Sequence, residues 1–205
     1  MKILIAVPTY ENIYPDTFKS IWDMDKCGHE CIFEFIRGYD VASARNRIAT
    51  KALELKADAV LMVDNDVVIP EDTLKNFTDD IKPVQLGYMP RRPKNGEQVD
   101  ERTVIFKNDI GNWTHPYLNH EIRDLKDSGQ YKVLVRGGGL GCAFIQTDVF
   151  RKLNFPYFLW VNSPLGNNFQ QSEDMYFCEQ CLGYHVPVYL DTRISCGHLM
   201  RWIQY

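Results

Sequence analysis

Short apolar runs and segments with helical spacing alternate along the first part of the chain. The runs at residues 2–7 and 59–63 have the pattern of buried strands, and the runs at 31–36 and 84–88 are expected to be two further strands. Apolar positions at helical spacing predict a helix over residues 15–24 and another that begins after Asp40. A third is expected to start at Pro70 and to bury Leu74, Phe77 and Ile81. This order predicts a doubly wound α/β half with right-handed crossovers.

The pattern changes after residue 88. Residues 91–130 are polar and turn-rich, with one strand-like run at 102–106. Strands are expected again at 131–135 and 142–146, followed by a helix over 172–182 with Ser172 as its N-cap and a last strand at 186–190. We therefore predict one α/β domain over 1–205. Its Rossmann-like first half carries a mixed, mainly parallel central sheet flanked by helices.

Composition and charge narrow the class of protein. The 205 residues are 45% hydrophobic and 24% charged, as in a globular chain, and the net charge of −4 argues against a nucleic-acid partner. No run approaches the roughly 20 apolar residues of a membrane span, and the opening apolar run is too short for a secretory signal. We expect a cytoplasmic protein whose six cysteines are reduced.

The stretch VLMVDNDVVIP places Asp64 and Asp66 directly after a predicted buried strand. Ligands of open α/β sheets bind at the carboxyl ends of strands, and residues two apart in an extended chain point the same way. Two adjacent carboxylates repel one another unless a cation joins them, and oxygen ligands suit Mg²⁺ or Mn²⁺. The alternative is a polar strand end in which Asn65 or Asp66 hydrogen-bonds a turn.

Several segments together resemble the GT-A-fold glycosyltransferases that use nucleotide sugars, in particular the inverting, family-2-like members. The segment KADAVLMVDNDVVIPEDTL is similar to their metal-binding segment, and VPTYEN to their opening strand and loop. The sequences ARNR (44–47), GGGLG (137–141), SED (172–174) and CGH (196–198) resemble further motifs in the family's order. The resemblance covers most of the chain except about 91–130.

The resemblance implies roles for individual residues. Asp66 and His198 would hold Mn²⁺ or Mg²⁺, and Asp174 would be the catalytic base of an inverting transfer. The donor side would consist of Pro8, Thr9, Tyr10, Glu11, Asp40, Arg45, Asn46, Asp64 and Asn65. The acceptor or sugar side would consist of Gly138, Gly139, Leu140 and Glu173. Residues 1–88 would then be the nucleotide-binding half, 89–130 an irregular acceptor-side excursion, and 131–205 the acceptor half.

A purely structural role could also explain each of these residues. Asp40 can cap a helix, Arg45 can lie on a solvated helix face, and Ser172 with two following acids makes a complete helix start. A histidine such as His198 is often a structural residue, and the glycines of 137–141 can form a hairpin or bulge.

We expect a metal-dependent glycosyltransferase that moves a sugar from a UDP- or GDP-sugar to an acceptor hydroxyl. A saccharide, a lipid-linked carrier, a protein and a small molecule all stay open as acceptors. The rivals are a non-catalytic nucleotide- or sugar-binding protein of the same fold and a sugar-nucleotide nucleotidyltransferase. The second would need a glycine-rich basic loop after the first strand, which VPTYEN is not. At 205 residues the chain is short for this family, so a homo-oligomer could supply missing elements.

Overall fold

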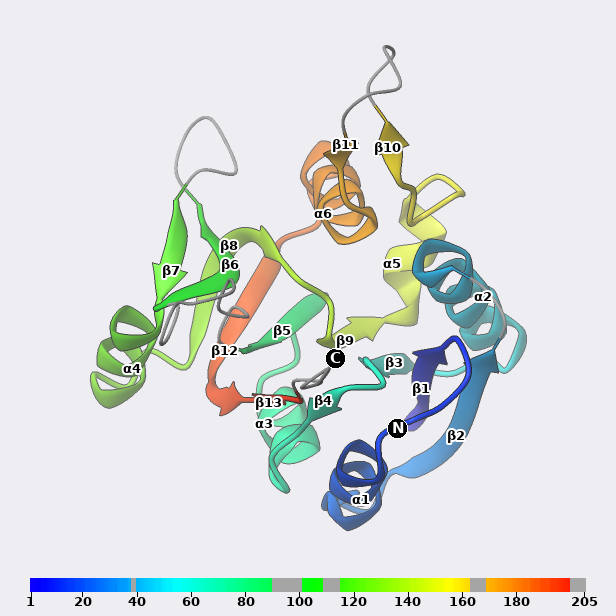
Figure 1. The fold of residues 1–205 in the computed structure, drawn as a ribbon, viewed down its shortest axis with the longest axis horizontal. Helices are drawn as coiled ribbons and strands as arrows, with labels where there is room; N and C mark the ends of the chain where they lie inside the picture. Colours follow the sequence, from blue (N-terminus) through cyan, green and yellow to red (C-terminus); the bar gives the residue numbers. More distant parts are fainter. Residues whose placement is uncertain (38–39, 90–100, 109–114, 163–168, 200–205) are drawn as a thin grey trace, which may run out of the picture.

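A computed structural model describes residues 1–37, 40–89, 101–108, 115–162 and 169–199. Its centre is a nine-stranded sheet with the order β2-β1-β3-β9-β5-β12-β8-β6-β7 (Figure 1). In that order the strands are Glu30–Arg37, Lys2–Thr9, Ala59–Val63, Cys142–Gln146, Val84–Tyr88, Val188–Ser195, Lys132–Gly138, Arg102–Lys107 and Pro116–Leu118.

The sheet is mixed, as predicted. Strands β1, β2 and β3 pair in parallel, and so do β5 and β12. Strand β9 lies antiparallel between β3 and β5, while β8, β6 and β7 extend the far side of the sheet in antiparallel pairs. Six strands (β1, β2, β3, β5, β12 and β6) therefore point one way and three the other. The carboxyl ends of β1, β3 and β12 meet at one edge of the sheet.

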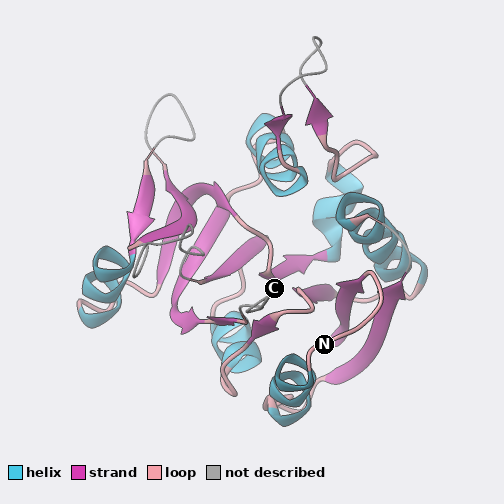
Figure 2. Cartoon of the chain, in the orientation of Figure 1, coloured by secondary structure: helices cyan, strands magenta, loops and turns pink. Residues whose placement is uncertain are grey.

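Helices cover both faces of the sheet (Figure 2). They are α1 (Pro15–Asp23), α2 (Val41–Glu54), α3 (Thr73–Asp79), α4 (Asn119–Asp127), α5 (Thr147–Lys152) and α6 (Glu173–Gly183). Two small sheets complete the described structure, β10 (Val161–Asn162) with β11 (Phe169–Gln171) and β4 (Val67–Val68) with β13 (Gly197–His198). No helix within the described ranges is both long and apolar enough to cross a membrane.

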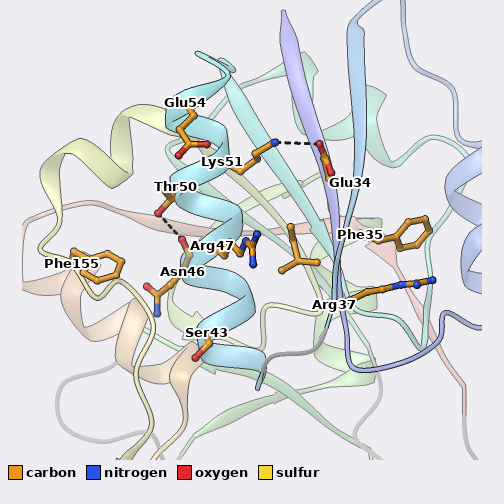
Figure 3. Close-up of a pocket in the computed structure, with 11 residues that line it drawn as sticks. Glu34, Phe35, Arg37, Ser43, Asn46, Arg47, Thr50, Lys51, Glu54 and Phe155 are labelled. Atoms are coloured by element: carbon orange, nitrogen blue, oxygen red, sulfur yellow. Dashed lines mark hydrogen bonds and ion pairs between the residues drawn. The ribbon is translucent and has the colours of Figure 1, made fainter.

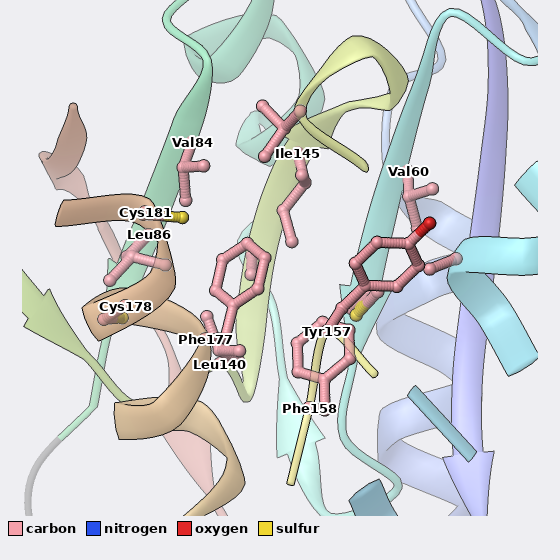
Figure 4. Packing of buried hydrophobic residues seen from close by; sticks show 14 of the residues in the cluster. Val60, Val84, Leu86, Leu140, Ile145, Tyr157, Phe158, Phe177, Cys178 and Cys181 are labelled. Carbon is pink, nitrogen blue, oxygen red and sulfur yellow. The ribbon is translucent and has the colours of Figure 1, made fainter. Parts of the chain in front are cut away.

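The side chains of alternate residues in the central strands pack into two separate hydrophobic cores. Leu4 of β1 and Met62 of β3 join one core with α2, α5 and α6, whereas Ile5 and Leu61 join the other with α1 and α3. In the first core the rings of Phe158 and Phe177 stack with centroids 4.8 Å apart, so α6 is anchored to the segment that follows α5 (Figure 4). Strands buried on both faces explain the continuous apolar runs in the sequence.

Some predicted elements differ from the observed ones. Helix α3 begins at Thr73 rather than at Pro70, because the Thr73 amide and hydroxyl both donate to the Pro70 carbonyl and close a turn first. Ile81 lies beyond that helix and is exposed, although Leu74 and Phe77 are buried as expected.

The prediction that 89–130 is an irregular excursion is wrong for its described part. That part carries β6, β7 and α4, and β6 pairs with β8 so that the central sheet continues into it. Helix α4 buries only Ile122 and so shows no apolar stripe in the sequence. Its start is stabilised instead by Glu121, which accepts a hydrogen bond from the Leu118 amide and one from Lys107.

Candidate active site

A cavity of about 480 Å³ opens where β1 and β3 end. Polar side chains from separate parts of the chain reach it, which fits the rule that ligands of α/β sheets bind at the carboxyl ends of strands. Its lining residues are Pro8, Thr9, Tyr10, Asp40, Val41, Ala44, Asp64, Asn65, Asp66 and His198. Eight of the eleven residues that were predicted for the donor side or as metal ligands are among them.

The segment 64–66 leaves β3 in a tight turn. The Asp64 amide donates to the Gly141 carbonyl (2.9 Å), and the Val67 amide donates back to the Asp64 carbonyl (3.1 Å). The Asn65 side chain turns away from that pair and donates to the Asn12 carbonyl (2.9 Å). Asn65 thus fixes the loop after β1, while the turn presents Asp64 and Asp66 to the cavity.

Strand β13 brings the end of the described chain to this turn. It pairs with β4, with His198 opposite Val67, and the Leu199 amide donates to the Asp66 carbonyl (2.8 Å). As a result His198 Nε2 lies 3.5 Å from Asp66 Oδ2. A carboxylate and an imidazole are suitable ligands for one divalent ion. No group of three or more histidine, cysteine or acidic side chains in the described ranges is placed to hold a metal.

Arg45 lies beneath the cavity on α2, with 2% of its surface exposed. Its Nη2 donates to both carboxylate oxygens of Asp64 (2.8 and 3.1 Å), and its Nη1 donates to Glu173 Oε1 (2.5 Å). Burial alone would lower the pKa of Arg45, but the negative charges of Asp64, Glu173 and the nearby Asp174 outweigh it and raise that pKa. The guanidinium therefore stays charged and joins the Asp64 segment to the start of α6.

The first turn of α6 presents two acids on the other side of Arg45. Ser172 is the N-cap, as predicted, and its hydroxyl accepts from the Met175 amide. Asp174 Oδ1 accepts hydrogen bonds from Ser172 and from the Met175 amide (2.8 Å for the latter). Its Oδ2 faces the glycine loop, where a Cβ on Gly139 would lie 3.7 Å away. Asp174 and the glycine loop are thus adjacent, and their acceptor-side role stays a prediction.

Burial is the main influence on the pKa of Glu173. Its side chain is 6% exposed, and this burial raises the pKa of Glu173, with Arg45 opposing the rise and Asp174 adding to it. The Arg45 guanidinium is thus the group that favours the charged form of Glu173 against burial.

Asp40 serves as the N-cap of α2, as predicted, and also lines the cavity. Its carboxylate accepts from the amides of Ala42 and Ser43 (both 3.1 Å) and from the Ser43 hydroxyl. The Ser43 hydroxyl is the main cause that lowers the pKa of Asp40. A ligand in the cavity would meet a fixed negative charge here.

Several other predicted residues are not among those that line this cavity. Asn46 donates to the Phe158 carbonyl (2.7 Å) and accepts from the Tyr157 amide (2.8 Å), so its amide group joins α2 to that segment. Glu11 is exposed and is not among the lining residues. Leu140 is fully buried in the apolar core, and a Cβ on Gly138 would clash with β6. Their roles in binding stay predictions.

Gly141 is the residue that sequence analysis did not assign. Besides accepting the Asp64 amide, it leaves no room for a side chain, because a Cβ would lie 3.2 Å from Asp64 Oδ2 and 2.6 Å from Met89 Cε. The sequence offered one sign of this role, because Gly141 is the last glycine of GGGLG and directly precedes a strand. A glycine at such a position often lets a neighbouring group approach the backbone closely.

A larger cavity, about 760 Å³, lies between β2 and α2 (Figure 3). Its charges include Lys51 and Glu34, which pair at 3.6 Å across it. It contains none of the three carboxylates Asp64, Asp66 and Asp174. Cavity size alone therefore does not identify the site. The smaller cavity is the candidate because Asp64, Asp66 and His198 line it.

No protein-family model and no curated protein sequence matches this chain. Solved structures do match it over almost its whole length. A197 from STIV has 18% sequence identity and a TM-score of 0.62, with 98% of this chain and 87% of that chain covered. GalNAc-T7, solved with UDP, GalNAc and Mn²⁺, has 10% identity and a TM-score of 0.60, with 98% and 44% covered.

The chain has the GT-A fold. S. aureus TarS residues 1–349, solved with UDP-GlcNAc, is a further GT-A neighbour, with 15% identity, a TM-score of 0.53, and 100% of this chain and 62% of that chain covered. This chain therefore spans less than two thirds of the GalNAc-T7 and TarS chains that it matches. The predicted GT-A architecture is confirmed, and at these identities the likeness concerns the fold.

Proposed function

We propose that this GT-A protein is a metal-dependent glycosyltransferase that transfers a sugar from a nucleoside diphosphate sugar to an acceptor hydroxyl. The observation that carries the proposal is the pairing of β13 with β4, which sets His198 beside Asp66 in a cavity at the strand ends. That cavity, at about 480 Å³, falls within the size of small-molecule sites.

The donor set fits Mn²⁺ or Mg²⁺. Asp66 offers a carboxylate and His198 an imidazole, and two protein ligands leave coordination positions for the oxygens of a diphosphate. When bound, the ion would stabilise the negative charge that grows on the leaving diphosphate. Asp64, which Arg45 holds by two hydrogen bonds, would contact the ribose or a metal-bound water, and Tyr10 would stack on the base.

Asp174 is the proposed general base. It removes the proton of the acceptor hydroxyl while the acceptor oxygen forms a bond to the anomeric carbon of the sugar. The bond from that carbon to the diphosphate oxygen breaks, and its electron pair leaves with the nucleoside diphosphate. Attack opposite the leaving group inverts the anomeric configuration. Gly139, next to Asp174 Oδ2, gives the sugar a surface without side chains.

The nucleotide is UDP or GDP, and UDP is the first to test because GalNAc-T7 and TarS were solved with UDP and UDP-GlcNAc. The acceptor is a saccharide, a lipid-linked carrier, a protein or a small molecule. The cytoplasmic location and the homo-oligomer stay predictions.

Thermal unfolding tests the metal–diphosphate site. A ligand at about 100 times its dissociation constant stabilises the fold by about 2.7 kcal/mol. For a chain of this size that corresponds to a rise in melting temperature of roughly 5–10 °C. We expect this rise only when Mn²⁺ and UDP or GDP are added together, and we expect Asp66→Asn and His198→Ala to abolish it.

Two matched variants serve as controls. Asp148→Asn and His120→Ala change the same residue types on exposed helix surfaces away from the cavity and should keep the full rise. Release of UDP or GDP from a panel of nucleotide sugars then measures turnover. If the wild type binds the nucleotide without releasing it from any sugar donor, the protein is a binding module. If it shows no rise with any nucleotide, the metal–diphosphate site does not exist.

A further inference from the structure

We propose that Arg45 is a positioning residue that holds the donor side and the acceptor side of the site in one fixed arrangement. This inference rests on the proposed function. Arg45 itself does not line the cavity, so it does not act by contacting the substrate. It acts through Asp64, which lines the cavity, and through Glu173, which opens the helix that carries Asp174.

The first argument is geometric. One planar guanidinium uses Nη1 for Glu173 and Nη2 for both oxygens of Asp64. These two partners lie 128 and 19 residues away in the sequence and come from opposite halves of the chain. A fork with five donors in a plane fixes the direction of each carboxylate as well as its distance.

The second argument is electrostatic. The side chains of Arg45 and Glu173 are 3% and 6% exposed, and that of Asp64 is 29% exposed, so water screens these charges weakly. Without Arg45 the three carboxylates Asp64, Glu173 and Asp174 would repel one another at the centre of the site. The Arg45 charge is therefore required for Asp64 and Glu173 to approach as they do.

The third argument links Glu173 to the proposed base. Glu173 and Asp174 are consecutive residues in the first turn of α6, and Phe177 and Cys178 bury the next turn in the core. Fixing the Glu173 carboxylate therefore fixes the start of α6 and with it the direction of Asp174. A misplacement of about 1 Å at a reacting group can cost about 100-fold in rate.

The variants Arg45→Lys and Glu173→Gln distinguish the contact of Arg45 with Asp64 from its contact with Glu173. A lysine keeps the positive charge but is a single ammonium without the planar fork, so it cannot hold both carboxylates in this geometry. We expect Arg45→Lys to lower donor-hydrolysis kcat about 100-fold and to weaken Mn²⁺–nucleotide binding about tenfold. Glu173→Gln leaves Arg45 with Asp64, so we expect kcat to fall about tenfold while nucleotide affinity stays within about twofold of wild type.

Lys132→Met is the matched control. Lys132 lies 2.6 Å from the fully buried Asp191 in a second ion-pair network outside the cavity, so its loss also disrupts a buried pair. We expect a lower melting temperature but wild-type kcat and nucleotide affinity per folded molecule. The double variant Arg45→Lys/Glu173→Gln completes a double-mutant cycle. Because both substitutions disrupt the same Arg45–Glu173 contact, the kcat of the double variant should be close to that of Arg45→Lys alone.

Three results would overturn the inference in distinguishable ways. If Arg45→Lys keeps wild-type kcat and affinity, as the control does, Arg45 only stabilises the fold. If the two single variants lower kcat independently, so that their effects multiply, Arg45 does not act through Glu173. If wild type itself shows no metal-dependent nucleotide binding and no turnover, the proposed function fails and the inference falls with it.

Discussion

At the scale of single residues, Asp40 illustrates how one carboxylate serves both a helix and the cavity. It caps α2 through the amides of Ala42 and Ser43, and the Ser43 hydroxyl holds its pKa below the usual value. A carboxyl whose pKa is lower in the folded state stabilises the fold above the unfolded pKa of about 3.9, and this contribution is lost as the pH falls.

Asp40→Asn tests that contribution, because asparagine caps a helix about as well but does not titrate. We expect the free energy of unfolding of wild type, relative to the variant, to be highest above about pH 5 and to decline as the pH falls below about 4. Urea unfolding at several pH values measures it. A difference that stays constant with pH would show that the Asp40 charge contributes nothing.

At the scale of elements, the loop between β8 and β9 sets the position of Asp64. Gly141 accepts the Asp64 amide and has no space for a side chain between Asp64 and Met89. We expect Gly141→Ala to weaken Mn²⁺–nucleotide binding about tenfold, equivalent to roughly 1.4 kcal/mol, because Asp64 or the flexible Met89 must move.

Gly183→Ala is the control for that change. A Cβ there would meet nothing within 4 Å, so the same added methyl group should leave nucleotide affinity unchanged. Isothermal titration of each protein with UDP or GDP in the presence of Mn²⁺ gives the comparison. Equal affinities for the two variants would mean that the loop does not position Asp64.

At the scale of the whole molecule, the solvent exposure of the cysteines shows how well the two cores exclude water. Cys142, Cys178, Cys181 and Cys196 are at most 3% exposed, whereas Cys27 is exposed and Cys31 is half-buried. Burial raises the pKa of the Cys178 thiol to about 12, which keeps it protonated at neutral pH. A buried thiol of this kind reacts only after the fold opens.

We therefore expect a disulfide reagent such as Ellman's reagent to modify one thiol quickly and a second more slowly in the native protein. All six cysteines should react in denaturing urea. Absorbance of the released thionitrobenzoate counts them. Rapid reaction of four or more thiols under native conditions would show that at least one core opens readily.

The elements that the sequence predicted well depend on residues close together in the chain. The runs at 59–63 and 84–88 became strands with those bounds, and Asp40 and Ser172 cap the predicted helices. Helix α4 was missed because its start depends on Lys107, fourteen residues from Glu121, and not on an apolar stripe.

The sequence by itself determined the buried strands, the helix caps and the residue types that a metal–diphosphate site needs, because continuous apolar runs and cap preferences act over a few neighbours. Only the tertiary structure decided which of those residues meet. Strand β13 brings His198 to Asp66, and Arg45 reaches Asp64 and Glu173 across 19 and 128 residues. Such partners are selected by the packing of helices on the sheet, which brings distant charges into one buried space where each needs a counter-charge.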